Sequence, residues 1–156
     1  MELRLTVSSA VCRVPVPAGW CIADDSELAD TRVATEAPVS DDGGFLANLV
    51  LTAADDQAGS FRDWQVTTDQ LLPEMLHDFL LIDLERRDVA GHPGGRRLAH
   101  HVTPDGTAVT MEQWFTLVDG IGWTFTATID SLRYDEFADV FGEAADAMQV
   151  SRERAR

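Results

Sequence analysis

The sequence contains no lysine, only two cysteines and no apolar run that approaches the length of a membrane span. All 12 of its basic residues are arginines, against 27 acidic residues, and the formal net charge is −15. A field of this sign repels phosphate groups and anionic lipid headgroups. We therefore expect no binding to nucleic acid and none to membranes, whereas a protein partner is easier to accommodate.

The scarcity of cysteine also limits what the protein can be. Cys12 and Cys21 are too few for a disulfide framework, and their separation matches no zinc motif. The first residues, Glu2–Val7, alternate like a strand and lack the apolar core and cleavage site of a signal peptide. We expect a cytoplasmic protein whose thiols are reduced.

What the sequence does contain is typical of a globular domain. Its 156 residues are 45% hydrophobic, and four tryptophans add large apolar side chains. We expect a single domain over residues 1–150, followed by an arginine-rich C-terminal tail over residues 151–156.

Hydrophobic periodicity predicts the elements of this domain. Alternating patterns indicate strands, including a meander of about four antiparallel strands between residues 80 and 130. Ser60 can cap a helix whose apolar stripe includes Trp64, although Pro73 should kink or divide that helix. A second amphipathic helix is expected at about 132–148. The predicted fold class is α+β, with an antiparallel sheet of about six strands packed with two or three helices.

Four arginines flank a predicted hairpin loop at Gly91–Gly95. The two strands of this hairpin would bring them close together in an otherwise acidic protein, as Arg86, Arg87, Arg96 and Arg97. One interpretation is a patch that binds an anion or an acidic peptide. The other is a solvated hairpin in which the arginines pair with neighbouring acids such as Glu85 and Asp88.

The last two strands of the meander provide the best candidate for a binding surface. Their odd-numbered residues, such as Val109 and Phe125, are apolar and should face the core. Their even-numbered residues, with Asn48 beside them, should form a polar face with one large aromatic side chain: Thr110, Glu112, Trp114, Thr124, Thr126 and Thr128. We predict that this face binds a peptide or protein, because Trp is a common interface anchor. The alternative is that a helix covers the face and Trp114 is a packing residue.

No set of residues indicates catalysis. His100 and His101 are adjacent in a predicted strand, so their side chains point to opposite faces and cannot share a metal ion. The acidic pairs lack the spacing of a calcium loop, and no nucleophile motif is present. The sequence predicts no catalytic residue, no metal site and no cofactor, and we expect that the protein is not an enzyme.

The order of these features resembles a known fold group. A turn at Pro17–Trp20 leads into a strand, a helix follows, a later strand ends at Gly91, and the strand Thr107–Trp114 ends in Gln-Trp. The strand Trp123–Thr128 and the C-terminal amphipathic helix complete the pattern. This arrangement resembles the PsbP-like fold group, in particular its branch of small bacterial proteins of the DcrB, LpqN and Eag types.

The resemblance implies an antiparallel sheet with helices packed against it, and a function in binding. Members of the group act as extrinsic assembly factors, lipoproteins or chaperones that hold partner proteins, and they share no active site. By this resemblance the chain is an adaptor or chaperone-like protein that engages a protein or peptide. We expect a monomer or a homodimer. Two alternatives remain open: a carrier of a small ligand in a cleft between sheet and helix, and an enzyme.

Overall fold

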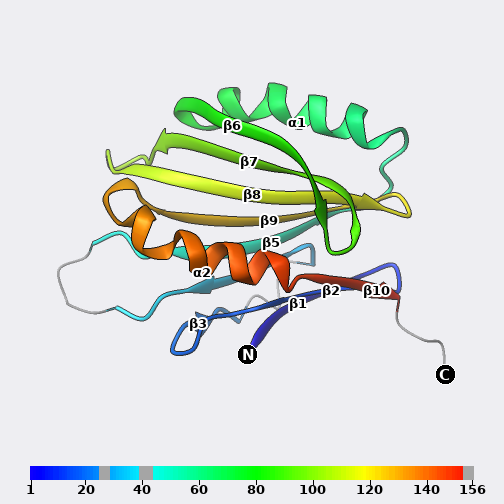
Figure 1. The fold of residues 1–156 in the computed structure, drawn as a ribbon, viewed down its shortest axis with the longest axis horizontal. Coiled ribbons are helices and arrows are strands. Elements are labelled where there is room, and N and C mark those ends of the chain that lie inside the picture. Colours follow the sequence, from blue (N-terminus) through cyan, green and yellow to red (C-terminus); the bar gives the residue numbers. More distant parts are fainter. Residues whose placement is uncertain (25–28, 39–43, 153–156) are drawn as a thin grey trace.

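The computed structural model describes residues 1–24, 29–38 and 44–152. These residues form two antiparallel sheets (Figure 1). The smaller sheet has three strands, in the order β1 (Glu2–Val7), β2 (Ala10–Pro15) and β10 (Gln149–Arg152). The larger sheet has seven, in the order β3 (Cys21–Ile22), β4 (Thr31–Thr35), β5 (Asn48–Ala54), β9 (Ile121–Asp130), β8 (Ala108–Val118), β7 (His92–Val102) and β6 (His77–Val89).

Two-residue turns fix the register of the long hairpins. At Ala90–Gly91 and at Asp119–Gly120 both residues have positive φ angles, between 51° and 79°. This is the turn geometry whose twist matches that of the paired strands, and it is the reason for glycine at the second position. The turn between β6 and β7 is therefore shorter than the predicted loop Gly91–Gly95.

Most of that predicted loop is the first part of β7, where glycine is needed for packing. Gly94 and Gly95 are buried, and Gly95 pairs with Phe115 of β8. A Cβ atom at Gly95 would lie 2.6 Å from the Phe115 ring. Glycines inside a strand often mark such a close approach, and in the sequence they look like a turn.

Helix α1 (Phe61–Met75) begins at a capping box. The Ser60 hydroxyl accepts a hydrogen bond from the Asp63 N–H at 3.1 Å, and the Asp63 carboxylate accepts one from the Ser60 N–H. Pro73 does not divide the helix, contrary to expectation, because it lies in the last turn and the helix ends at Met75.

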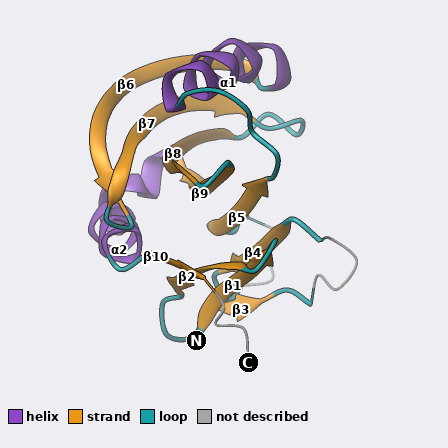
Figure 2. Cartoon of the chain, turned by 90° about the vertical axis from the view of Figure 1, so that its right-hand side faces the viewer, coloured by secondary structure: helices purple, strands orange, loops and turns teal. Residues whose placement is uncertain are grey.

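Helix α1 packs on one face of the larger sheet, on the side of β6 and β7 (Figure 2). Phe61 stacks on Phe115, with ring centroids 5.8 Å apart. The indole of Trp64 lies directly over Gly122 of β9, where a Cβ atom would meet its ring. Aromatic side chains therefore anchor the N-terminal half of α1.

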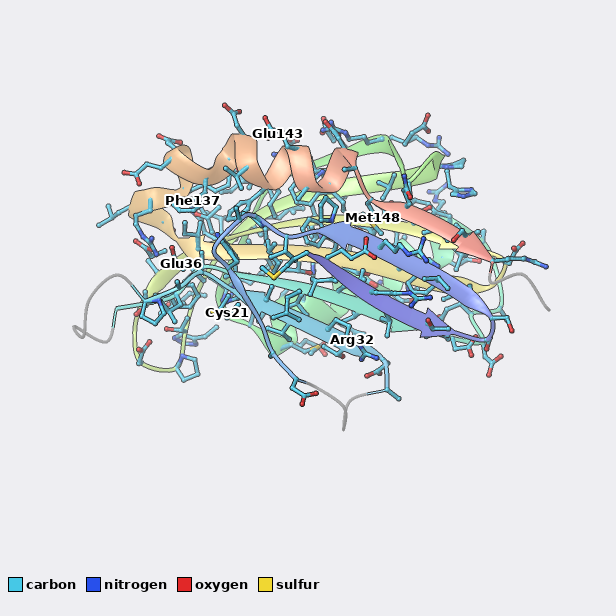
Figure 3. The ribbon with its side chains drawn as sticks, turned by 90° about the horizontal axis from the view of Figure 1, so that it is seen from below. Cys21, Arg32, Glu36, Phe137, Glu143 and Met148 are labelled. Carbon is cyan, nitrogen blue, oxygen red and sulfur yellow. The ribbon has the colours of Figure 1, made fainter. Side chains whose placement is uncertain are left out.

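Helix α2 (Tyr134–Asp146) and the smaller sheet cover the opposite face of the larger sheet. A 3-10 turn, η1 (Ser131–Arg133), precedes α2. Phe137 and Met148 point toward the sheets, and Glu143 points away from them (Figure 3). The main hydrophobic core lies between these layers and includes Leu3, Leu5, Val14, Leu49, Phe125, Ile129 and Phe141.

The structure confirms an α+β fold of antiparallel strands with helices packed against them. The strands divide into two sheets, where the sequence predicted one sheet of about six. The prediction of a C-terminal tail that begins at residue 151 was wrong, because Ser151 and Arg152 belong to β10 and pair with β2. The last part of that expected tail, 153–156, lies outside the described residues.

Candidate partner-binding surface

The predicted polar face is not one surface, because its residues lie on both faces of the larger sheet. Trp114 of β8 pairs with Phe125 of β9. Directly paired residues share a face, so the even-numbered residues of β8 lie beside the odd-numbered residues of β9. Three of the six candidates therefore face the core beneath α2: Thr110, Glu112 and Trp114. The other three lie on the face that α1 covers in part: Asn48, Thr124 and Thr126.

Trp114 is a core residue. It is 2% exposed, and its ring stacks on Phe125 with centroids 5.6 Å apart. Its indole Nε1 is buried and has no hydrogen-bond partner among the described residues. The prediction that Trp114 anchors a partner was wrong, and the alternative of a packing role holds.

Thr110 and Glu112 are also buried, and internal partners satisfy them. The Thr110 and Ser131 hydroxyls lie 2.9 Å apart. Glu112 accepts hydrogen bonds from Arg96 Nε at 2.6 Å and from the Tyr134 hydroxyl at 2.9 Å. Burial and the adjacent Glu112 charge raise the pKa of Tyr134 to about 12, so its hydroxyl remains a donor at neutral pH. These residues support the fold and are not available to a partner.

The other three candidates remain accessible. Asn48, Thr124 and Thr126 are half-buried on β5 and β9, to one side of α1. With their neighbours on the same face they form what we call the threonine strip: Asn48, Val50, Thr52, Thr124, Thr126 and Thr128. Their role in binding stays a prediction.

The four arginines of the first long hairpin do not form one patch. Arg87 reaches Asp146 of α2 at 3.2 Å, and Arg96 pairs with Glu112 on the same face. Arg97 lies on the opposite face and is 1% exposed. Arg87 and Arg96 each also lie 3.6 Å from Glu85, as the interpretation with neighbouring acids predicted, whereas Arg97 is buried and pairs with Asp69 of α1. The common anion patch was therefore wrong. Arg86 has no such partner among the described residues.

Arg97 ties α1 to the sheet. Its guanidinium donates to the Asp69 carboxylate from Nε at 3.1 Å and also from Nη2, and to Gln113 Oε1 at 2.7 Å. It also lies over the Phe115 ring, 4.5 Å from the centroid. A buried charge is tolerated only when its partners are fixed, so this cluster holds α1 in one position.

The outer edge of β6 is a sheet edge with exposed apolar side chains. This strand ends the seven-stranded sheet, so one side of its backbone pairs with no described strand. Its exposed side chains include Leu80, which is 61% exposed, and beside it the end of α1 exposes Met75, at 72%. We call this set the apolar edge: Leu71, Met75, Leu80, Leu81, Ile82 and Leu84.

Bulges shape one end of β6. The register against β7 shifts between His77 and Leu80 and again between Leu81 and Asp83, and Asp78 has a φ of 51°. Bulges bend an edge strand and increase its twist. From Asp83 to Val89 the pairing is regular, so this half of β6 offers an unbroken backbone edge.

A pocket lies at each end of the apolar edge. The first, of about 370 Å³, lies between the first turn of α1 and β6, and its lining includes Phe61, Arg62, Gln65, Leu84 and Arg86. The second, of about 520 Å³, lies beyond the end of α1, and its lining includes Met75, Leu76, His101, Val102 and Pro104. Burial lowers the pKa of His101, so its imidazole is neutral near pH 7.

The described residues form no metal-binding cluster, and one of their two thiols, that of Cys21, is exposed. They contain no group of three or more His, Cys, Asp or Glu side chains that could hold a metal ion. Both cysteines are free thiols, and burial raises the pKa of Cys12 to about 12, so its thiol is protonated and unreactive. Across the described ranges, no helix has the length and apolar character needed to cross a membrane.

No protein-family model and no curated protein matches the sequence. Solved structures do match. LpqN from Mycobacterium tuberculosis, involved in cell envelope biogenesis, superimposes with a TM-score of 0.68 and 12% identity, over 97% of this chain and 91% of LpqN. The cyanobacterial PsbP protein of Synechocystis gives a TM-score of 0.62 and 16% identity, over 96% and 92%. The fold is PsbP-like.

The PsbP-like fold extends to a eukaryotic protein. The Ran-binding protein Mog1p of Saccharomyces cerevisiae has a TM-score of 0.61 and 9% identity, over 97% of this chain and 95% of Mog1p. At sequence identities this low, the similarity to these structures shows a shared fold and no shared function. The chain therefore shares a scaffold with these proteins, and its own surfaces must indicate what it binds.

Proposed function

We propose that the protein is a non-catalytic binding protein, adaptor-like or chaperone-like, that holds an extended segment of a partner protein along the outer edge of β6. The observation that carries this proposal is a 13-residue edge strand that exposes large apolar side chains. Natural sheets usually protect such an edge with charges, proline or a covering segment. Charges from Asp83 onward and bulges near its start protect parts of β6, but the stretch of Leu80, Leu81 and Ile82 carries no charge and is exposed. Such an exposed apolar stretch on an edge strand is a site where another strand adds.

Strand addition would use both the backbone and the side chains of this surface. An added strand pairs its N–H and C=O groups with those that β6 directs outward, which is a source of affinity that does not depend on sequence. Its apolar side chains would cover Leu80 and Ile82, and each Å² of apolar surface removed from water contributes about 25 cal/mol. The pocket beside Met75 and Pro104 has room for one more apolar side chain.

The structural relatives support binding rather than catalysis. Mog1p is a Ran-binding protein, and LpqN takes part in cell envelope biogenesis. Because they share only the fold with this chain, neither Ran nor an envelope component is proposed as its partner. The threonine strip, with Asn48, Thr124 and Thr126, is a predicted second contact for the same partner.

The test is a selection of random peptides, displayed on phage, against the immobilised protein. We expect the enriched peptides to alternate apolar and polar residues, as a strand does. Their binding should be lost in the double variant Leu80→Lys/Ile82→Lys, because an added strand would bury the new charges. Both native side chains are exposed, so circular dichroism and thermal unfolding should be close to those of the wild type.

The matched control is the double variant Ile22→Lys/Leu132→Lys. It adds the same charge at two exposed apolar residues outside the apolar edge, one of them on β3 at the other end of the sheet. It should bind the peptides as the wild type does. Peptides that bind the β6 variant and the wild type equally would contradict the proposal, and so would a selection that enriches none.

A further inference from the structure

Two arginines differ from all the others in the described part of the chain. Six form salt bridges with carboxylates, namely Arg13, Arg87, Arg96, Arg97, Arg133 and Arg152. Arg4 and Arg32 also have interactions within the protein. Arg62 and Arg86 have neither an ion pair nor a hydrogen bond to any described residue. In a chain with 27 acidic residues, two neighbouring cations without a carboxylate are unexpected.

Arg62 and Arg86 line the same pocket. Arg62 lies in the first turn of α1 and Arg86 on β6, and the pocket of about 370 Å³ between these elements is also lined by Phe61, Gln65 and Leu84. Glu85 contributes to the lining, but its carboxylate is 3.6 Å from both Arg87 and Arg96 on the opposite face. The pocket therefore combines two free guanidinium groups with apolar walls.

This pocket adjoins the apolar edge, and the register defines how they relate. Leu84 pairs with Arg97 and Arg86 with Gly95, so Leu84 and Arg86 are two residues apart on the α1 face of β6. A strand added to β6 would pass Arg86 and then Leu84 with successive side chains of one face. One bound segment would thus contact both the arginine pocket and the apolar side chain of Leu84.

We infer that the partner segment carries one acidic residue, which Arg62 and Arg86 bind, followed two positions later by a large apolar residue over Leu84. This inference rests on the proposed function. The acidic residue comes first because every strand pair of the larger sheet is antiparallel, and an antiparallel segment meets Arg86 before Leu84. Guanidinium groups bind a carboxylate with paired, charge-assisted hydrogen bonds.

A single carboxylate fits the molecule better than an acidic run. The formal net charge of −15 repels a polyanionic segment at long range, whereas it matters less for one charge that meets two arginines directly. The ligand is therefore an isolated Asp or Glu within an apolar strand-forming sequence.

The experiment repeats the peptide selection on the wild type and on Arg62→Gln/Arg86→Gln. On the wild type, Asp or Glu should be enriched two positions before an apolar residue. On the variant, the apolar alternation should remain and the acidic preference should disappear. The matched control is Arg13→Gln/Arg152→Gln, which makes the same change in net charge at two arginines of the smaller sheet, one half-buried and one exposed, and should keep the acidic preference.

Binding constants then test the contact directly. Replacing the acidic residue of an enriched peptide with its amide should weaken binding to the wild type roughly three- to tenfold, since these groups are partly solvated. The same replacement should have little effect on binding to Arg62→Gln/Arg86→Gln. An apolar pattern without acidic preference, or an equal preference on both proteins, would overturn this inference alone. Peptides that bind Leu80→Lys/Ile82→Lys as tightly as the wild type would overturn the proposed function as well.

Discussion

The two faces of the seven-stranded sheet differ in how much of their surface other elements cover. On one face, α2 and the smaller sheet close the core, and residues such as Leu49, Phe125 and Ile129 are fully buried. On the other, α1 covers the side of β6 and β7, while the threonine strip stays half-exposed and the apolar edge lies open. The closed face accounts for stability, and the incomplete face holds the surfaces with which another molecule could pair.

The charged groups beside the apolar edge differ from those in the core of the closed face. Glu36, on the closed face, is 7% exposed and accepts two hydrogen bonds from Arg133, at 2.6 and 3.1 Å. Arg62 and Arg86, beside the apolar edge, have no partner among the described residues. An unsatisfied surface charge costs little in water, so the fold tolerates it where a ligand can later use it.

The largest effect is expected for Trp114→Ala, which would open a hole in the closed face. Removing a buried Trp side chain costs about 3–5 kcal/mol, and we expect a loss of that size in the free energy of unfolding, measured by urea denaturation. Trp114→Phe should cost less than Trp114→Ala, because it leaves a smaller cavity and the Nε1 atom makes no hydrogen bond to a described residue. A loss below about 1 kcal/mol in Trp114→Ala would mean that this side chain is not core.

A smaller effect is expected for Gly122→Ala, which tests the attachment of α1. The added Cβ atom would lie 2.6 Å from Cε2 of Trp64, and such overpacking costs about 1–3 kcal/mol. Urea denaturation measures the loss, and hydrogen exchange should show that α1 is the element that loosens. In the double variant Trp64→Leu/Gly122→Ala the smaller side chain should leave room for the methyl group. Strictly additive effects of the two substitutions would show that ring and methyl group do not meet.

Most strands of this fold could be predicted from the sequence. Which residues of neighbouring strands share a face could not, because the pattern within one strand does not fix its register against the next. Alternation shows that Val109 and Phe125 each lie on an apolar side of their own strand. Whether these sides coincide depends on the turn between the strands. The two-residue turn Asp119–Gly120 pairs even residues of β8 with odd residues of β9, so Trp114 joins Phe125 in the core.

The binding surface depends on order in the sheet, which is a long-range property. The leucines around position 81 indicate a strand, but only the position of β6 at the end of the sheet makes them an exposed edge. Arg86 was one of four arginines in the expected patch, and Arg62 was not a candidate, because the contact between α1 and β6 joins residues far apart in the chain. The polar strand β10 was missed because four residues with little apolar character carry no strand signal.

Acid should weaken the closed face through Glu36. Burial alone would raise the pKa of Glu36, but hydrogen bonds from Arg133 and from the Ala47 N–H outweigh it and lower the pKa below its usual value of 4.5. The ionised carboxylate therefore stabilises the fold above about pH 4.5, and this contribution is lost as the pH falls through the lower folded-state pKa. The difference in melting temperature between wild type and Glu36→Gln should be constant near neutrality and shrink in acid. A difference that does not change with pH would contradict this role.

The smallest effect, and one of opposite sign, is expected for Gly142→Ala in α2. A Cβ atom at Gly142 would meet nothing within 4 Å, in contrast to Gly122 under Trp64. Glycine inside a helix costs roughly 0.5–1 kcal/mol relative to alanine, so the variant should be more stable by about that amount in urea denaturation. A gain would mean that α2 is held by Phe141, Ala144 and Ala145 and leaves Gly142 free. A loss would mean that α2 packs more closely than described, and then both helices, not α1 alone, would depend on a glycine contact.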